Sequence, residues 1–133
     1  MLPRDWQLFL QKGQGKEMAI AQVSKEIAIF LGAYSDKVFI HHDYAIKAAE
    51  KHGVSPEDLC LLFDVVEYGR ALADRERHVT FLCQTSRGWF QVTVKRAEAS
   101  RRLYISTFYK TNRAEADRKS RKYKVIRKDK GAA

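Results

Sequence analysis

The stretch WFQVTVK, residues 89–95, decides the fold class because its side chains alternate between the two sides of the chain, the period of a β-strand. One face carries the apolar side chains Phe90, Val92 and Val94, and the other carries Trp89, Gln91, Thr93 and Lys95. A strand with one apolar face is typical of a sheet that is covered on that face. The core is therefore predicted to form on a sheet around this segment.

Two further strands are predicted beside it. Residues 78–83 show the same alternation before a turn, and the stretch LYISTFY, residues 103–109, follows after a loop. Short connections of this kind favour antiparallel neighbours, so the three segments are expected to form an antiparallel meander.

The register of the last two strands decides which side chains share a face. A hairpin centred near Ala99 pairs Lys95 with Leu103, Thr93 with Ile105 and Gln91 with Thr107. The polar face then gains Thr107 and Tyr109, and the core face gains Tyr104, Ser106 and Phe108. A slip of one residue would move Thr107 to the opposite face. Even in this register, Lys95 and Thr107 lie about four residues apart along the strands, roughly 13 Å.

The N-terminal half shows the helical period instead. Apolar residues three and four apart predict a helix over 16–31 that Gly32 ends, and a second over 43–52 that Gly53 ends. Asp43 is the expected N-cap of this second helix, and Ser55 that of a third, which ends near Gly69. The predicted buried face of the third helix comprises Leu59, Leu62, Phe63 and Val66.

These elements predict one α+β domain over residues 1–133. Residues 1–77 are expected to be mostly helical and to pack on one face of an antiparallel sheet over 78–112. Residues 113–133 are expected to form a basic tail or an edge strand. Within this segment, a helix is expected over 114–121 and the strand over 122–127.

The charge of the chain is unevenly distributed. Residues 1–77 contain 10 Lys and Arg against 12 Asp and Glu, a formal charge of −2, whereas residues 78–133 contain 15 against 4, or +11. A basic half of this kind favours a polyanionic partner, with nucleic acid expected first. The alternative is the solvated face of an ordinary basic protein.

Several classes of protein are disfavoured. The longest apolar run, residues 27–31, is too short to span a bilayer, and the N-terminus lacks the apolar segment of a signal peptide. We therefore expect no membrane association and a cytosolic or intravirion location. Cys60 and Cys83 are expected to be reduced, buried and small apolar residues. The four histidines show no metal-ligand spacing, and no glycine-rich phosphate loop occurs, so neither a metal nor another cofactor is expected.

Cleavage of RNA without a metal needs few groups. A base removes the 2′-hydroxyl proton, an acid protonates the leaving oxygen, and cations or hydroxyl donors stabilise the charged phosphorane. The predicted strands and the helix that ends at His52 offer such residues. Each also fits an ordinary role: His52 as a helix C-terminal residue, Lys95 as a solvated lysine and Thr107 as a strand former.

The order of the segments carries a resemblance to a known family. The matching pieces are LPRDWQLFL, AEKHG, SPEDLCLLFDVVEYGRAL, HVTFLCQTSRGWFQVTVKR, LYISTFYKTN and RKYKVIR, which together span nearly the whole chain. The chain resembles the C-terminal domain of Mu-like phage head morphogenesis proteins. That domain is one branch of the phage barnase/EndoU/colicin/RelE-like nucleases.

The resemblance implies a metal-independent endoribonuclease of phage origin, with a BECR-like RNase fold and a 2′,3′-cyclic phosphate product. It implies that His52 is the catalytic histidine, that Lys95 binds phosphate and that Thr107 supplies a hydroxyl. The chain departs from the family in two places. Gly53 follows His52 where relatives read K-H-P-E, and Tyr109 stands where many relatives carry the histidine of T-F-H-R. Tyr109 is expected either to donate the proton or to stack on a base.

RNA is the expected partner, in the cytoplasm of a bacterial host or in the virion. The residues predicted to bind it are Trp89, Gln91, Arg96, Lys110 and Arg113. Two alternatives remain. One is a non-catalytic nucleic-acid binder or inhibitor on the same fold, for which removal of residues 113–133 is expected to abolish function and leave the core folded. The other is a toxin that an acidic immunity protein neutralises. A structural role in the capsid is a further option.

Overall fold

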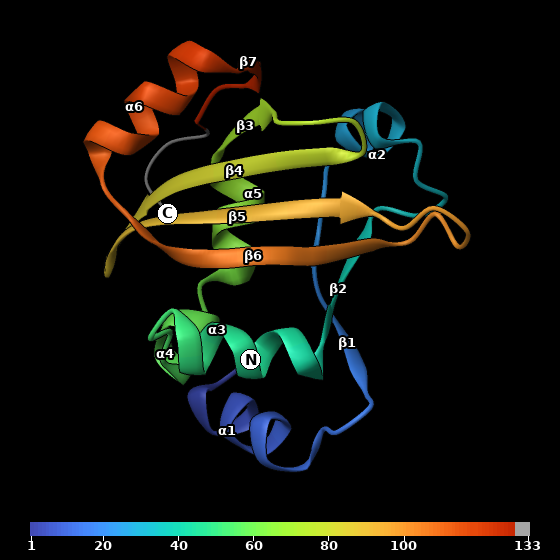
Figure 1. The fold of residues 1–133 in the computed structure, drawn as a ribbon, viewed down its shortest axis with the longest axis vertical. Coiled ribbons are helices and arrows are strands. Elements are labelled where there is room, and N and C mark those ends of the chain that lie inside the picture. Colours follow the sequence, from blue (N-terminus) through green and yellow to red (C-terminus); the bar gives the residue numbers. More distant parts are fainter. Residues whose placement is uncertain (130–133) are drawn as a thin grey trace.

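One twisted sheet runs through the protein, with helices around it (Figure 1). The computed structural model describes residues 1–129; residues 130–133, the end of the predicted tail, lie outside it. The helices are α1 (Pro3–Lys12), α2 (Lys25–Leu31), α3 (His42–Lys51), α4 (Pro56–Leu59), α5 (Leu62–Tyr68) and α6 (Arg113–Lys122). The strands are β1 (Glu17–Gln22), β2 (Lys37–His41), β3 (Arg70–Ala73), β4 (His78–Thr85), β5 (Gly88–Arg96), β6 (Leu103–Thr111) and β7 (Lys124–Arg127).

The strand order is β1-β2-β6-β5-β4-β3-β7. All neighbours are antiparallel except β2 and β6, which are parallel, so the sheet is mixed rather than purely antiparallel. The predicted α+β class and the predicted meander β4-β5-β6 are confirmed. None of the helices within residues 1–129 is long and apolar enough to cross a membrane.

Helices cover both faces of the sheet, which corrects the prediction of a single covered face. In Figure 1, α5 lies behind the sheet, where its buried Val65 and Val66 join the main core. On the opposite face, α6 packs its buried Ala116 into a second cluster with Leu72 and Leu82. The predicted edge strand at the C-terminal end is confirmed as β7, which pairs with β3. Much of the segment expected to be a tail is therefore a layer of the fold.

The helix predicted over residues 16–31 is wrong in its first half and confirmed in its second, which ends at Gly32 as predicted. Glu17–Gln22 form β1, which pairs with β2, and α2 begins only at Lys25. The Ser24 side chain accepts a hydrogen bond from the Ile27 N–H and caps α2, so the chain switches from strand to helix at this point. Residues 1–77 consequently contribute three strands to the sheet.

The third predicted helix is confirmed at its start and corrected in its middle. Ser55 and Asp58 form a capping box at α4, as the sequence indicates, but the helix is interrupted at Cys60 before α5 begins. The interruption rotates the buried face, so that Val65 is buried whereas Phe63 is 46% exposed. Cys60 is only half-buried, which corrects the expectation that both cysteines are buried.

A β-bulge sets the register between β5 and β6. Thr93 pairs with Thr107 and Gln91 with Tyr109, so the three predicted pairs are wrong. The register shifts after Thr93, where the Ser106 hydroxyl donates to the Thr93 carbonyl at 3.2 Å. Because of the bulge, the Ile105 side chain is buried in the core. Tyr104 pairs with Lys95, whereas the prediction placed Tyr104 on the core face with Phe108. Thr107 and Tyr109 nevertheless share a face with Gln91, as predicted.

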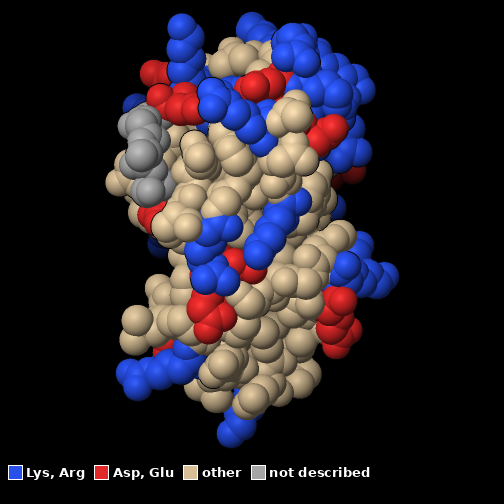
Figure 2. Space-filling view, turned by 90° about the vertical axis from the view of Figure 1, so that its left-hand side faces the viewer, with Lys and Arg blue, Asp and Glu red and all other residues tan. Residues whose placement is uncertain are grey.

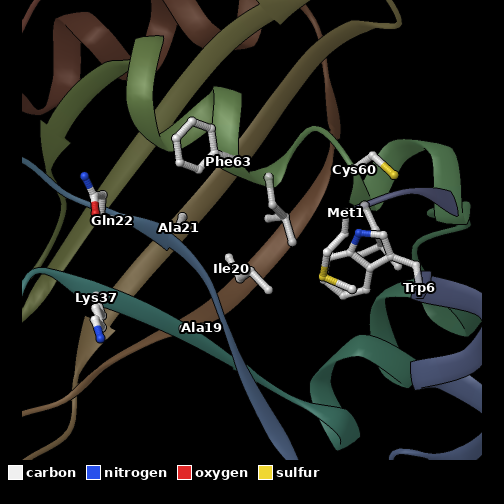
Figure 3. A pocket seen from close by; sticks show the side chains of 11 residues that line it. Met1, Trp6, Ala19, Ile20, Ala21, Gln22, Lys37, Cys60 and Phe63 are labelled. Carbon is white, nitrogen blue, oxygen red and sulfur yellow. The ribbon is translucent and has the colours of Figure 1, made fainter.

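The start of the chain closes one end of the molecule. The buried Trp6 of α1 borders an apolar hollow of about 410 Å³ between β1 and the α4–α5 segment. Figure 3 shows Phe63 over one part of this hollow, and Trp6 beside Met1 at another. The N-terminal motif thus has a structural role in packing.

Candidate functional site

The exposed side chain of His52 lies against Tyr109 at one end of the sheet. β6 pairs with β2 over only two residues, and beyond that pairing α3 packs against β6. The hydroxyl of Tyr44, on α3, accepts a hydrogen bond from the Phe108 N–H. Burial raises the pKa of Tyr44 to about 12, so this hydroxyl stays neutral at the edge of β6. His52 caps the end of α3 and Gly53 follows with a φ of 62°. These contacts bring the ring centroids of His52 and Tyr109 to 5.8 Å.

A lysine of α6, which packs on the face of the sheet that carries Gln91 and Tyr109, completes this site. The Lys119 ammonium donates to the Tyr109 hydroxyl at 3.1 Å and also to the side-chain carbonyl of Gln91. Gln91 is buried and pairs directly with Tyr109 across β5 and β6. We call these four residues, His52, Gln91, Tyr109 and Lys119, the His52 cluster. The sequence did not single out Lys119, which lies in the segment predicted to be a basic tail or an edge strand.

Two of the predicted catalytic residues do not join the His52 cluster. Lys95 is exposed and pairs with His78 and Tyr104, four residues along β5 from Gln91, or about 13 Å. Thr107 lies two residues before Tyr109 on β6 and shares its face of the sheet. Its hydroxyl, however, is buried and has no hydrogen-bond partner among residues 1–129. Thr107 pairs with Thr93, two residues along β5 from Lys95, so these two residues lie about 7 Å apart along the strands, closer than predicted, but Lys95 stays outside the His52 cluster.

The residues predicted to bind nucleic acid divide between the two ends of the sheet. Arg96 lies at the far end with Lys95, against the turn that follows α2. Trp89 and Arg113 line one polar hollow beside the His52 cluster. Lys110 lies at this same end, exposed. Figure 2 shows that Lys and Arg side chains gather at the top of the molecule, where α6 and β7 lie.

A buried carboxylate ties Lys110 and the β4–β5 turn to the helices. Asp58 is 1% exposed; it accepts from the Arg87 Nε at 2.7 Å and lies 3.8 Å from the Lys110 ammonium. Burial alone raises the pKa of Asp58, but the hydrogen bonds from Arg87 and from the Ser55 N–H, with the charge of Lys110, outweigh it. The net result is a pKa below the ordinary 3.8.

Replacement of Asp58 with asparagine is expected to lower the free energy of unfolding by about 2 kcal/mol near neutral pH, because charge-assisted hydrogen bonds are lost. The lowered pKa makes this stabilisation complete above pH 3.8, and it is lost as the pH falls through the folded-state pKa. Urea unfolding of both proteins at pH 6 and at about pH 2 should show the difference shrinking in acid. Glu57→Gln, an exposed neighbour on α4, is the matched control. A difference that persists in acid would contradict the assigned charge effect.

The remaining titratable side chains suggest neither a metal site nor a reactive thiol. Within residues 1–129, no three His, Cys, Asp or Glu side chains gather closely enough to hold a metal ion. Burial raises the pKa of the Cys83 thiol to about 11, which keeps it protonated at neutral pH. Comparison of the chain with protein-family models, curated proteins and solved structures found no match. The likeness to the phage nucleases rests on the sequence motifs alone.

Proposed function

We propose that this protein is a metal-independent endoribonuclease that acts through the His52 cluster. The observation that carries the proposal is the contact between His52 and Tyr109, which sets an exposed imidazole beside a phenol that is hydrogen-bonded to an ammonium group. An acid, a base and a cation at one point are the groups that metal-free RNA cleavage requires. The sequence resemblance to phage nucleases supports the same chemistry.

The proposed reaction moves two protons. His52 accepts the proton of the ribose 2′-hydroxyl, and the resulting oxygen attacks the adjacent phosphorus. The Tyr109 hydroxyl donates its proton to the leaving 5′-oxygen. Because the Tyr109 oxygen already accepts from Lys119, its own proton remains available to donate. The products are a 2′,3′-cyclic phosphate and a free 5′-hydroxyl.

Lys119 supplies the positive charge in this proposal. Its ammonium lies at Tyr109, where negative charge develops on the phosphorane and on the departing oxygen. This is the role that the sequence resemblance gave to Lys95, and the proposal gives it instead to a residue of α6. The basic side chains over α6 would attract the RNA backbone to the same end of the molecule (Figure 2).

Purified protein is expected to cleave single-stranded RNA in the presence of EDTA and to leave 2′,3′-cyclic phosphate ends. The physical reason is that the acid, the base and the cation are all side chains of this chain. Gel analysis of the RNA, with mass spectrometry of the ends, measures this. RNA that carries a 2′-O-methyl group at every position is the control, because its nucleophile is blocked. RNA that stays intact at a molar excess of protein would refute the proposed activity.

A second candidate function is RNA binding without cleavage, as in an inhibitor that reuses the fold. It is favoured by the buried Thr107 hydroxyl, which has no hydrogen-bond partner among residues 1–129, and by the position of Lys95, which is about 13 Å along β5 from Gln91. It predicts binding that weakens steeply with salt and no products in the same assay. The toxin hypothesis instead predicts cleavage that an acidic partner protein blocks.

A further inference from the structure

A polar hollow of about 470 Å³ opens beside the His52 cluster. It lies between the end of α5, the β4–β5 turn and the first turns of α6. Its walls combine two aromatic rings, two arginines, two carboxylates and an amide, from Tyr68, Trp89, Arg70, Arg113, Asp117, Asp129 and Gln84. Ligand pockets of this size that mix ring surfaces with a few polar groups are typical of sites for small organic groups.

One wall of the hollow, Trp89, lies on β5 close to the His52 cluster. Trp89 and Gln91 are alternate residues of β5 on one face, and they pair with Thr111 and Tyr109. Two residues along a strand span about 7 Å. A strand of RNA whose phosphate lies at Tyr109 can therefore place the neighbouring base in the hollow.

The charges in the hollow give a bound nucleotide one orientation. Arg113 begins α6, is exposed and has no ion-pair partner among residues 1–129, so it can bind phosphate. Arg70 is instead held by Asp129 at 3.0 Å and by the Ser120 hydroxyl at 2.6 Å. Asp117, 45% exposed, lies at a longer 3.7 Å from Arg70 and keeps free acceptor positions. A carboxylate repels phosphate, so the base turns toward Asp117 and the phosphate toward Arg113.

From this arrangement we infer that the hollow binds the RNA base next to the cleaved phosphate and prefers bases with an exocyclic amino group. The half-buried Trp89 stacks on the base. Adenine, cytosine and guanine donate an amino N–H to the Asp117 carboxylate. Uracil has a single ring N–H flanked by two carbonyl oxygens, which the carboxylate repels. The inference rests on the proposed RNA substrate, but binding at this site does not require cleavage.

Tryptophan fluorescence tests the site directly. The chain has two tryptophans, and Trp6 is buried at the other end of the molecule, so quenching by a bound base reports on Trp89. The probes are uncleavable 2′-O-methyl oligonucleotides of adenine, cytosine and uracil. We expect saturable quenching, with the adenine and cytosine probes binding about tenfold more tightly than the uracil probe, the effect of one charge-assisted hydrogen bond. A Trp89→Leu protein should lose the quenching.

Asp117→Asn is expected to reduce the preference to less than about threefold, because the amide offers an acceptor without the charge. Glu115→Gln is the matched control, since Glu115 is on the same helix, pairs with Arg118 and does not line the hollow. Equal affinity for all three probes, or a preference that Asp117→Asn leaves unchanged, would overturn this site. Base-selective binding without any cleavage would support the site and remove the proposed enzyme activity, so the two outcomes are separable.

Discussion

Replacement of His52 with alanine is expected to lower the rate of RNA cleavage by at least about a hundredfold, the usual contribution of a positioned general base. The side chain is exposed at the end of α3, and only the His52 backbone takes part in the cap of that helix. The fold should therefore survive the change, which circular dichroism can verify. Single-turnover cleavage of a labelled oligonucleotide in EDTA measures the effect.

His78→Ala is the matched control for this measurement. His78 is likewise a histidine, but it begins β4 and pairs with Lys95 at the far end of β5. Its removal is expected to change the rate by less than about threefold, as for a residue without contact to substrate. Imidazole added to the His52→Ala protein should restore part of the lost rate. Equal losses for the two histidine variants would argue against His52 as the base.

A comparison of two lysines separates the site seen in the fold from the one that the sequence resemblance implied. Lys119→Met should lower the cleavage rate by at least about tenfold more than Lys95→Met, because only Lys119 contacts Tyr109. If Lys95→Met lowered the rate more than Lys119→Met, the phosphate would instead bind at Lys95, and cleavage would occur at the other end of the sheet.

Local patterns predicted the parts of the fold that depend on local physics. The alternation in β5 is a property of neighbouring side chains, and it placed Gln91 and Tyr109 on one face correctly. The capping box at Ser55 was also visible, because it needs only four consecutive residues. Around β1, by contrast, Ala19 in the strand and Val23 just after it fit a helical period, and this pattern hides a strand that depends on its pairing with β2.

The candidate site was harder to predict because it depends on contacts between distant segments. Ser106 offered no sequence signal for the bulge that shifts the register, yet this shift pairs Gln91 with Tyr109. Lys119 could be assigned only once α6 was known to fold back over the sheet. The helix has a single buried apolar residue, Ala116, so its sequence shows no apolar stripe. The shared face of Gln91 and Tyr109 was therefore predictable, whereas their direct pairing and the contribution of α6 were not.

This dependence on α6 leads to the second large effect. Replacement of Ala116 with glutamate is expected to lower the free energy of unfolding by about 3–5 kcal/mol, because it forces a carboxylate into a packed apolar contact. Ala116 is fully buried and packs with Leu72 and Leu82, which are also fully buried. Urea denaturation followed by circular dichroism measures the change.

Ala114→Glu is the matched control, because the same substitution then falls on an exposed position of α6. A glutamate in the first turn of a helix is mildly favourable, so this variant should keep its stability within about 0.5 kcal/mol. If α6 were a dispensable tail, as the sequence suggested, both variants would unfold at the same urea concentration and only RNA affinity would change. A selective loss in the Ala116→Glu protein would instead show that α6 is part of the folded core. The layer that presents Lys119 to Tyr109 would then also be one that the sheet needs for its stability.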